Sequence, residues 1–182
     1  KEEYKLQPLG KNGQWEIRLS QEKLNHLDLY RLRVHWPGGR GDRIPSYARR
    51  VVQDDQTKIF NAQVWRPQTE YEWQCPDFKR SDEPPYIYEI HVGMAQEAEK
   101  IGSYAEFTEL ILPRVIAAGY NTLQLMAIQE HPYYGSFGYQ VSNFFAASSR
   151  YGTPDELKAL IDAAHCAGLA VFMDIIHSHA VS

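Results

Sequence analysis

The pattern of hydrophobic and polar residues changes near residue 85 of the chain. Before this point apolar and polar residues alternate in short runs, as in 15–19 and 30–36. Alternation with a period of two is typical of half-buried antiparallel strands. The glycine-rich stretch 37–42 follows the second run and predicts a turn. We therefore expect residues 1–80 to form the last part of a small β-sandwich.

After residue 85 the pattern predicts strands that alternate with helices. Alternation of this kind indicates a parallel sheet. The third predicted strand is almost wholly apolar, as expected for a strand buried on both faces. The three predicted strands cover 86–90, 121–126 and 169–176.

The first predicted helix begins at a capping box made by Ser103 and Glu106 and ends at Gly119. Pro113 lies inside this stretch, so we expect either a kink or a late start. The residues expected on its buried face are Phe107, Leu110, Ile111 and Val115.

The second predicted helix has clearer boundaries. Thr153 is the expected cap, Pro154 takes the first helical position, Glu156 completes the capping box and Gly168 ends the helix. Apolar residues recur at helical spacing along its expected buried face, at Leu157, Leu160, Ile161 and Ala164.

Between the second strand and this helix, residues 127–152 show no clear element. Loops of about 25 residues are usually functional or disordered. This one is rich in aromatic residues and follows the carboxyl end of a predicted strand, where parallel α/β folds build their sites. The functional interpretation is therefore favoured.

Composition and charge exclude several classes of partner. The chain has 182 residues, 43% of them hydrophobic, and a net charge of -4. This balance gives no reason to expect nucleic acid or an anionic membrane as a partner. No apolar run reaches 18 residues, so we expect no membrane span.

The chain has two cysteines, Cys75 and Cys166, which lie far apart and outside any CxxC pair. We expect neither a disulfide nor a zinc site from this spacing. A reducing compartment, the cytoplasm, fits this usage best.

Candidate chemistry follows the third strand, where Asp174, His177 and His179 lie close together in sequence. Such groups are costly to bury without partners. A structural hydrogen-bond network and a metal site are two interpretations. The third is sugar recognition, in which a carboxylate and an imidazole bind hydroxyl groups of one glucose ring.

The loop supplies further candidates. Tyr139 follows Gly138 and could be a packed loop aromatic or a ring that stacks on a sugar. The segment from His131 to Tyr134 could be a rigid turn or another wall of a sugar subsite.

Several of these segments together resemble a known family. The first strand and the Asp174–His179 motif are similar to those of the α-amylase superfamily, and the loop closely resembles that of its glycogen branching enzymes. Stretches of the first part are similar to the starch-binding sandwich found before that barrel. The matching segments are 42–45, 49–54, 88–93, 137–154 and 174–179.

The resemblance implies a truncated starch-binding-like β-sandwich in 1–80 and the first three elements of a (β/α)8 barrel in 81–182. It implies a 1,4-α-glucan branching transferase that acts on glycogen or amylose-like chains by a retaining double displacement, without a cofactor. The catalytic carboxylates of the family come from later strands, so we expect this fragment alone to be inactive.

Roles for five residues also follow from the resemblance. Tyr139 would stack on the glucose at the cleavage subsite, His179 would bind its hydroxyl groups, and Asp174 would brace the site. His131 and Tyr134 would line it.

Ser178 stands where many α-amylases have a calcium-ligating Asn, so the resemblance implies no metal here. The alternatives are another hydrolase of the superfamily, such as a debranching enzyme, or a non-catalytic glucan-binding module.

Overall fold

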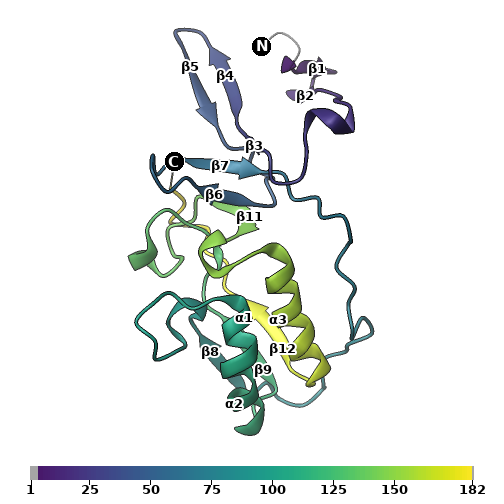
Figure 1. The fold of residues 1–182 in the computed structure, drawn as a ribbon, viewed down its shortest axis with the longest axis vertical. Coiled ribbons are helices and arrows are strands. Elements are labelled where there is room, and N and C mark those ends of the chain that lie inside the picture. The colour runs from purple at the N-terminus through teal and green to yellow at the C-terminus, as the bar shows by residue number, and fades with distance from the viewer. Residues whose placement is uncertain (1–3, 182) are drawn as a thin grey trace.

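The computed structural model describes residues 4–181, as an antiparallel β part followed by an α/β part (Figure 1). An extended segment of residues 64–86 runs along one side of the molecule and connects the two. The strands of the first part are β1 (Gln7–Leu9), β2 (Gln14–Glu16), β3 (Leu29–Tyr30), β4 (Leu32–Trp36), β5 (Gly39–Arg43), β6 (Val51–Gln53) and β7 (Phe60–Gln63).

These strands form three small antiparallel sheets: β1–β2, β4–β5 and β3–β7–β6. In the β4–β5 hairpin, Trp36 pairs with Gly39 and the turn closes at Gly38, whose φ is +88°. The turn predicted over 37–42 is therefore too long, because residues 39–42 belong to β5. The expected half-burial of β4 is also wrong, since Val34 and Trp36 are exposed on this two-stranded ribbon.

A small core joins the β3–β7–β6 sheet to the second part. Ala48, Val51 and Ala62 are buried together with Ala146 of β11 (Asn143–Ala147). Arg50 adds a hydrogen bond from its Nη1 to the Gly152 carbonyl at 3.1 Å. The antiparallel strands are thereby packed onto the loop that precedes the last helix.

The α/β part contains a parallel sheet of β8 (Ile87–Ile90), β9 (Thr122–Leu125) and β12 (Ala170–Met173) in the order β12–β9–β8. The predicted parallel arrangement is confirmed. The third strand, β12, ends three residues earlier than predicted. Beyond Met173 only the Asp174 N–H continues the pairing, with the Leu125 carbonyl at 3.0 Å.

Three helices, α1 (Tyr104–Glu106), α2 (Leu112–Ala117) and α3 (Pro154–Cys166), pack with the sheet around the main core (Figure 1). The residues of the sheet that enter this core include Tyr88, Ile90, Leu123, Leu125 and Val171.

The first predicted helix is divided by a π-helical turn at Phe107–Ile111. The Leu112 N–H donates to the Phe107 carbonyl, five residues back. This wider turn adds one residue to the helix just before Pro113. It is the irregularity that the position of Pro113 led us to expect. It also rotates the buried face, so the predicted burial of Leu110 is wrong and Leu112 is buried in its place.

The second predicted helix is α3, and its capping box is confirmed. The Thr153 side chain accepts from the Glu156 N–H, and the Glu156 carboxylate accepts from the Thr153 N–H. Gly168 follows the helix with φ +85°. The pattern did not predict that Asp162, on this helix, is buried.

Asp162 fixes the connecting segment to α3. Its carboxylate accepts hydrogen bonds from the Gln74 N–H at 2.7 Å, the Cys75 N–H at 3.0 Å and the Tyr71 hydroxyl at 2.9 Å. The Gln74 N–H contributes most to lowering the pKa of Asp162 below its ordinary value. This buried carboxylate therefore remains charged while it orders three groups of the segment.

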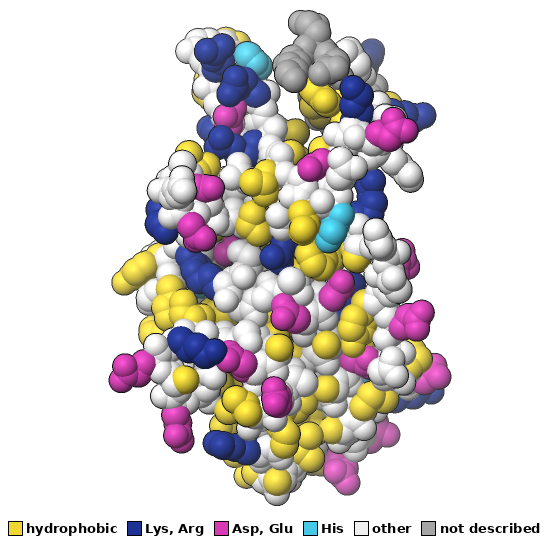
Figure 2. Space-filling view, in the orientation of Figure 1, with side chains coloured by type: hydrophobic (Ala, Val, Ile, Leu, Met, Phe, Trp, Pro, Cys, Tyr) yellow, Lys and Arg dark blue, Asp and Glu magenta, His cyan; other side chains and the backbone are white. Residues whose placement is uncertain are grey.

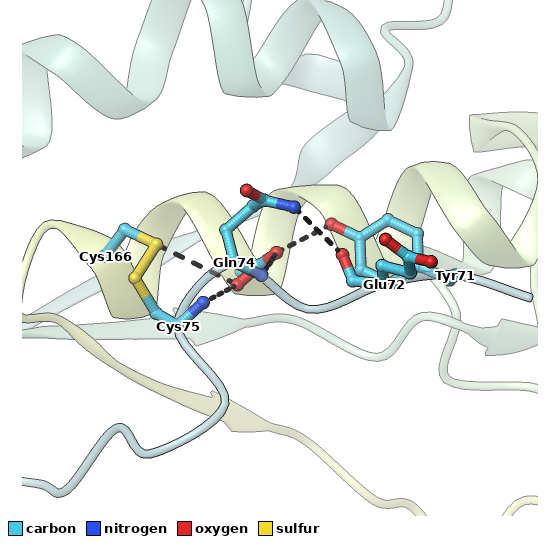
Figure 3. Close-up of a disulfide and its surroundings, with 6 residues drawn as sticks. Tyr71, Glu72, Gln74, Cys75 and Cys166 are labelled. Carbon is cyan, nitrogen blue, oxygen red and sulfur yellow. Dashed lines mark hydrogen bonds between the residues drawn. A yellow bond between two sulfur atoms is a disulfide. The ribbon is translucent and has the colours of Figure 1, made fainter.

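Beside it, Cys75 and Cys166 form a disulfide across a sequence separation of 91, with Cα atoms 5.4 Å apart (Figure 3). The prediction that the chain has no disulfide is wrong. Spacing in sequence could not reveal this pair, because the fold brings the connecting segment back against the end of α3.

The prediction of no element in 127–152 is also wrong. β10 (Gln129–Glu130) pairs with β11 in an antiparallel hairpin, with a register shift between its two residues. Short 3-10 turns at Tyr134–Ser136 and Ser149–Tyr151 order the remaining loop. Within residues 4–181 no helix is long and apolar enough to cross a membrane.

Candidate functional site

Polar side chains form a row across the parallel sheet, on the face opposite the main core. Register places Glu89 of β8 beside Gln124 of β9, and Asp174 follows β12. The Gln124 Nε2 donates to Glu89 Oε1 at 3.1 Å and to Asp174 Oδ1 at 2.9 Å. One amide therefore connects carboxylates that come from the two outer strands.

Tyr139 completes this row from the loop above the strand ends. Its hydroxyl donates to Asp174 Oδ2 at 3.1 Å. Burial, followed by the hydrogen bond to Asp174, raises the pKa of Tyr139 above its ordinary value. The phenol thus remains a protonated donor at neutral pH, and it orients one oxygen of the Asp174 carboxylate.

A glycine explains how the loop brings Tyr139 to this place. Gly138 has φ +89°, and a Cβ at this position would lie 1.8 Å from the Ala127 carbonyl oxygen. Only a residue without a side chain allows the backbone to pass so close to the end of β9. The sequence showed only that Gly138 precedes Tyr139, whereas the structural importance of Gly138 is this close approach.

His179 is exposed in a turn after the strand. No hydrogen bond joins it to Asp174 or Tyr139 among the described residues. The Val181 N–H donates to the Val141 carbonyl at 2.9 Å, which holds this terminal segment beside the Tyr139 loop. The predicted role of His179 in sugar binding stays a prediction.

His131 and Tyr134 lie on the inner side of the loop. His131 is fully buried, and its Nδ1 lies 2.9 Å from the Gln129 carbonyl oxygen. Burial lowers the pKa of His131, so the ring is neutral near pH 7. Tyr134 is half-buried and packs edge-on against His91 with ring centres 5.8 Å apart. Both residues therefore support the loop from within.

Glu130 and Arg150 were not predicted, yet they hold both ends of the loop. Glu130 is buried, its pKa is raised chiefly by burial, and it accepts from the Ser149 N–H at 2.8 Å. Arg150 donates to the carbonyls of His131 at 2.5 Å and Pro132 at 2.7 Å, and its Nη1 lies 3.9 Å from Glu130 Oε1. The presence of an acidic and a basic residue, Glu130 and Arg150, in the same loop was the sequence signal that could have predicted this pair.

Among the described residues, Asp174, His177 and His179 are not part of a group of side chains close enough together to bind a metal ion. In the described part of the chain, the group of potential ligands that lies close together is Cys75, Asp162 and Cys166, where both sulfur atoms are already bonded. His177 instead stacks on Phe144 with ring centres 5.9 Å apart.

Comparison with known proteins identifies the fold around this row. The profile of a family described as "Alpha amylase, catalytic domain" matches residues 118–182. The 1,4-alpha-glucan-branching enzyme of Aspergillus oryzae is 47% identical over 183 residues, covering 95% of this chain. The chain is homologous to part of the 1,4-alpha-glucan-branching enzymes.

Other branching enzymes match over similar lengths. The enzyme of Dictyostelium discoideum is 42% identical and covers 92% of the chain, and that of Saccharomyces cerevisiae is 46% identical and covers 79%. The chain spans only about a quarter of the branching enzymes that it matches, 26% for the Aspergillus and Dictyostelium proteins and 21% for the yeast protein.

Solved structures agree on the architecture. A Salmonella typhimurium structure provisionally named an alpha amylase superposes with a TM-score of 0.64 at 29% identity, over 74% of this chain and 22% of that one. The catalytic module of the glycogen-degrading pneumococcal virulence factor SpuA superposes with a TM-score of 0.61 at 21% identity, over 81% of this chain and 27% of that one. The second likeness shows the fold alone.

Proposed function

We propose that the full-length protein containing this chain is a 1,4-α-glucan branching enzyme. It cleaves an α-1,4 linkage and transfers the released segment to a 6-hydroxyl group, which forms an α-1,6 branch in glycogen or an amylose-like chain. The observation that supports this most directly is the identity of 42–47% to branching enzymes across most of the chain. The hydrogen bond between Tyr139 and Asp174 supports it from the structure.

The proposed reaction is a retaining double displacement, which needs no cofactor. A carboxylate attacks the anomeric carbon while an acid protonates the departing oxygen, and these groups lie about 5–5.5 Å apart in retaining enzymes. A glucan hydroxyl group then replaces water as the acceptor. The resemblance assigns these carboxylates to later strands of the barrel than the three described.

In this proposal the described residues bind and orient the donor chain. Tyr139 offers a ring for stacking, and Asp174 holds its hydroxyl group while bracing the site. His179 binds sugar hydroxyl groups from its exposed turn. Fixed groups of this kind lower the barrier by holding the reacting sugar in a productive orientation.

The same proposal divides the chain at residue 80. Residues 1–80 are the end of a starch-binding-like β-sandwich, and residues 81–182 are the first three elements of a (β/α)8 barrel. The proposed compartment is the cytoplasm. Cell fractionation should recover the full-length protein in the cytosolic fraction, and recovery in a secreted or organellar fraction would contradict this placement.

The test uses the full-length protein incubated with amylose. We expect the iodine complex to lose absorbance, new α-1,6 linkages to accumulate, and the number of reducing ends to stay nearly constant. A steady rise in reducing ends without new branches would identify a hydrolase of the same superfamily. Glucan binding with neither outcome would indicate a non-catalytic module.

A further inference from the structure

The disulfide lies at the surface of the molecule. Cys166 is exposed at the end of α3, and Cys75 is partly exposed on the connecting segment (Figure 3). Neither cysteine belongs to the main core or to the small core beneath the antiparallel sheet. A thiol in solution can therefore reach this bond, and accessible disulfides are the ones that exchange most readily.

Two contacts besides the bond hold the cysteines together. Asp162, one helical turn before Cys166 on α3, accepts from the Cys75 N–H at 3.0 Å. A second contact joins Phe78 to His165, the residue before Cys166, with ring centres 4.1 Å apart. Neither contact uses a sulfur atom, so breaking the bond removes neither of them. The two Cα atoms, 5.4 Å apart, are therefore kept within the distance that a disulfide needs.

This arrangement favours a bond that opens and closes reversibly. After reduction the two thiols stay neighbours, so the bond re-forms in an intramolecular step with a high effective concentration. In the cytoplasm, the compartment proposed above, most thiols are kept reduced, and the disulfides that do form are usually transient or redox-sensing. The accessible, preorganised pair therefore has the two properties that reversible exchange needs.

The two sulfur atoms differ in how they respond to an attacking thiolate. Cys166 is the more exposed of the two residues. Its Sγ lies 3.9 Å from Asp162 Oδ1 at the carboxyl end of α3, and the negative charge of the carboxylate and of the helix end disfavours a thiolate there. Exchange is faster when the departing sulfur is the more stable thiolate. Access and charge therefore both favour attack on Cys166, with Cys75 as the departing sulfur.

We propose that Cys75 and Cys166 are a reversible redox site, whose thiol–disulfide state sets how firmly the connecting segment is docked on α3. A small thiolate attacks the Cys166 sulfur, the bond between the cysteines breaks, and Cys75 leaves as a thiolate that takes up a proton. A second thiolate attacks the sulfur of the bound reagent. This step releases Cys166 as a thiol and leaves the reagent oxidised to its own disulfide. The redox site does not depend on the reaction that the full-length protein catalyses.

The first test equilibrates the full-length protein in mixtures of reduced and oxidised glutathione, followed by acid quenching, alkylation and mass spectrometry of the two cysteine peptides. We expect Cys75 and Cys166 to become reduced together over one range of glutathione ratios. The disulfide should re-form when the ratio is reversed. A bond that stays closed at every ratio, or that fails to re-form, would overturn the redox site.

A limiting amount of reduced glutathione identifies the attacked sulfur. Rapid acid quenching traps the mixed disulfide, which the same mass spectrometry locates. We expect glutathione on the Cys166 peptide several-fold more often than on the Cys75 peptide. Equal labelling, or an excess on Cys75, would overturn the assignment of Cys166 as the attacked sulfur.

Limited digestion with trypsin measures the docking of the segment. Lys79 and Arg80 are exposed shortly after Cys75, and we expect cleavage at them to become several-fold faster after reduction. Cys166→Ser, which cannot form the bond, should show the fast rate with or without a reductant. Cleavage in the antiparallel part is the control and should not change; Figure 2 shows Lys and Arg gathered there around the β4–β5 hairpin. Equal rates at Lys79 and Arg80 in both redox states would overturn the effect on docking.

Discussion

The hydroxyl group of Tyr139 and the carboxylate of Asp174 meet at 3.1 Å although they are 35 residues apart in the chain. Tyr139 lies in the loop between β10 and β11, whereas Asp174 directly follows β12. The contact therefore depends on the path of the loop as well as on the sheet.

Substitution of Tyr139 tests this contact in the full-length protein. Tyr139→Phe removes one hydrogen bond, worth about 1 kcal/mol, so we expect kcat/KM for branching to fall about fivefold. Tyr139→Ala also removes the ring, and we expect a loss on the order of a hundredfold. Tyr133→Phe, at an exposed tyrosine of the same loop, is the control and should retain full activity. Equal rates for Tyr139→Ala and the parent protein would exclude the stacking role.

Gly138 offers a second test, because a matched glycine exists elsewhere. Gly138 and Gly119 both have positive φ, but a Cβ at Gly119 would meet nothing within 4 Å. We expect Gly119→Ala to cost about 1–2 kcal/mol of unfolding free energy, the conformational penalty alone. Gly138→Ala adds the clash with the Ala127 carbonyl, so it should cost more and also lower branching activity. Denaturant unfolding and the iodine assay measure the two effects, and identical costs would contradict the close approach.

The disulfide gives a prediction about stability. Closing a loop with a sequence separation of 91 should stabilise the fold by about 4–5 kcal/mol in the chain-entropy description. We expect the oxidised protein to lose up to this amount of unfolding free energy on reduction, as measured in urea. The Cys75→Ser, Cys166→Ser double variant is the control and should not respond to the reductant. A response from that variant would show that the reagent acts elsewhere.

His131 gives a prediction about pH. Burial places its pKa in the folded protein below the ordinary value of about 6.5, so the unfolded chain takes up the proton first as pH falls. The contribution of neutral His131 to the free energy of unfolding is therefore complete above about pH 6.5. It is lost as the pH falls towards and through the lowered pKa, by at most about 1.4 kcal/mol per pH unit.

Neighbouring groups also titrate, so the comparison needs a variant. His91 has a lowered pKa and acts in the same direction, whereas the raised pKa of Glu130 acts in the opposite direction. His131→Asn keeps a donor for the Gln129 carbonyl and removes one proton site. We expect its unfolding free energy to vary less than that of the parent between pH 7.5 and 5. Parallel curves would show that His131 does not carry the dependence.

Local signals in the sequence were sufficient for much of the α/β part. Both capping boxes and the glycines that end the helices act over a few residues, and the structure confirms them. The parallel order followed from the alternation of elements. The exposure of Leu110 could not be predicted in the same way, because a single added residue in the π-helical turn shifts the whole helical face.

Distant contacts explain what the sequence did not reveal. The pairing of Cys75 with Cys166 and the burial of Asp162 depend on where the connecting segment returns to α3. The β10–β11 hairpin was hidden because its first strand has two residues. At the candidate site, Asp174 and Tyr139 could be proposed from motifs, whereas Gln124 and Arg150 act through geometry that only the fold provides.

The disulfide also determines how the oxidised chain would respond to mechanical force. Tension applied between the two ends would pass through the Cys75–Cys166 bond and bypass β8 and β9, which lie inside the closed loop. β12 lies outside that loop, so it would be sheared away from β9 while the rest of the α/β part stayed slack. The covalent link thus directs the applied load onto the pairing of β12 with β9.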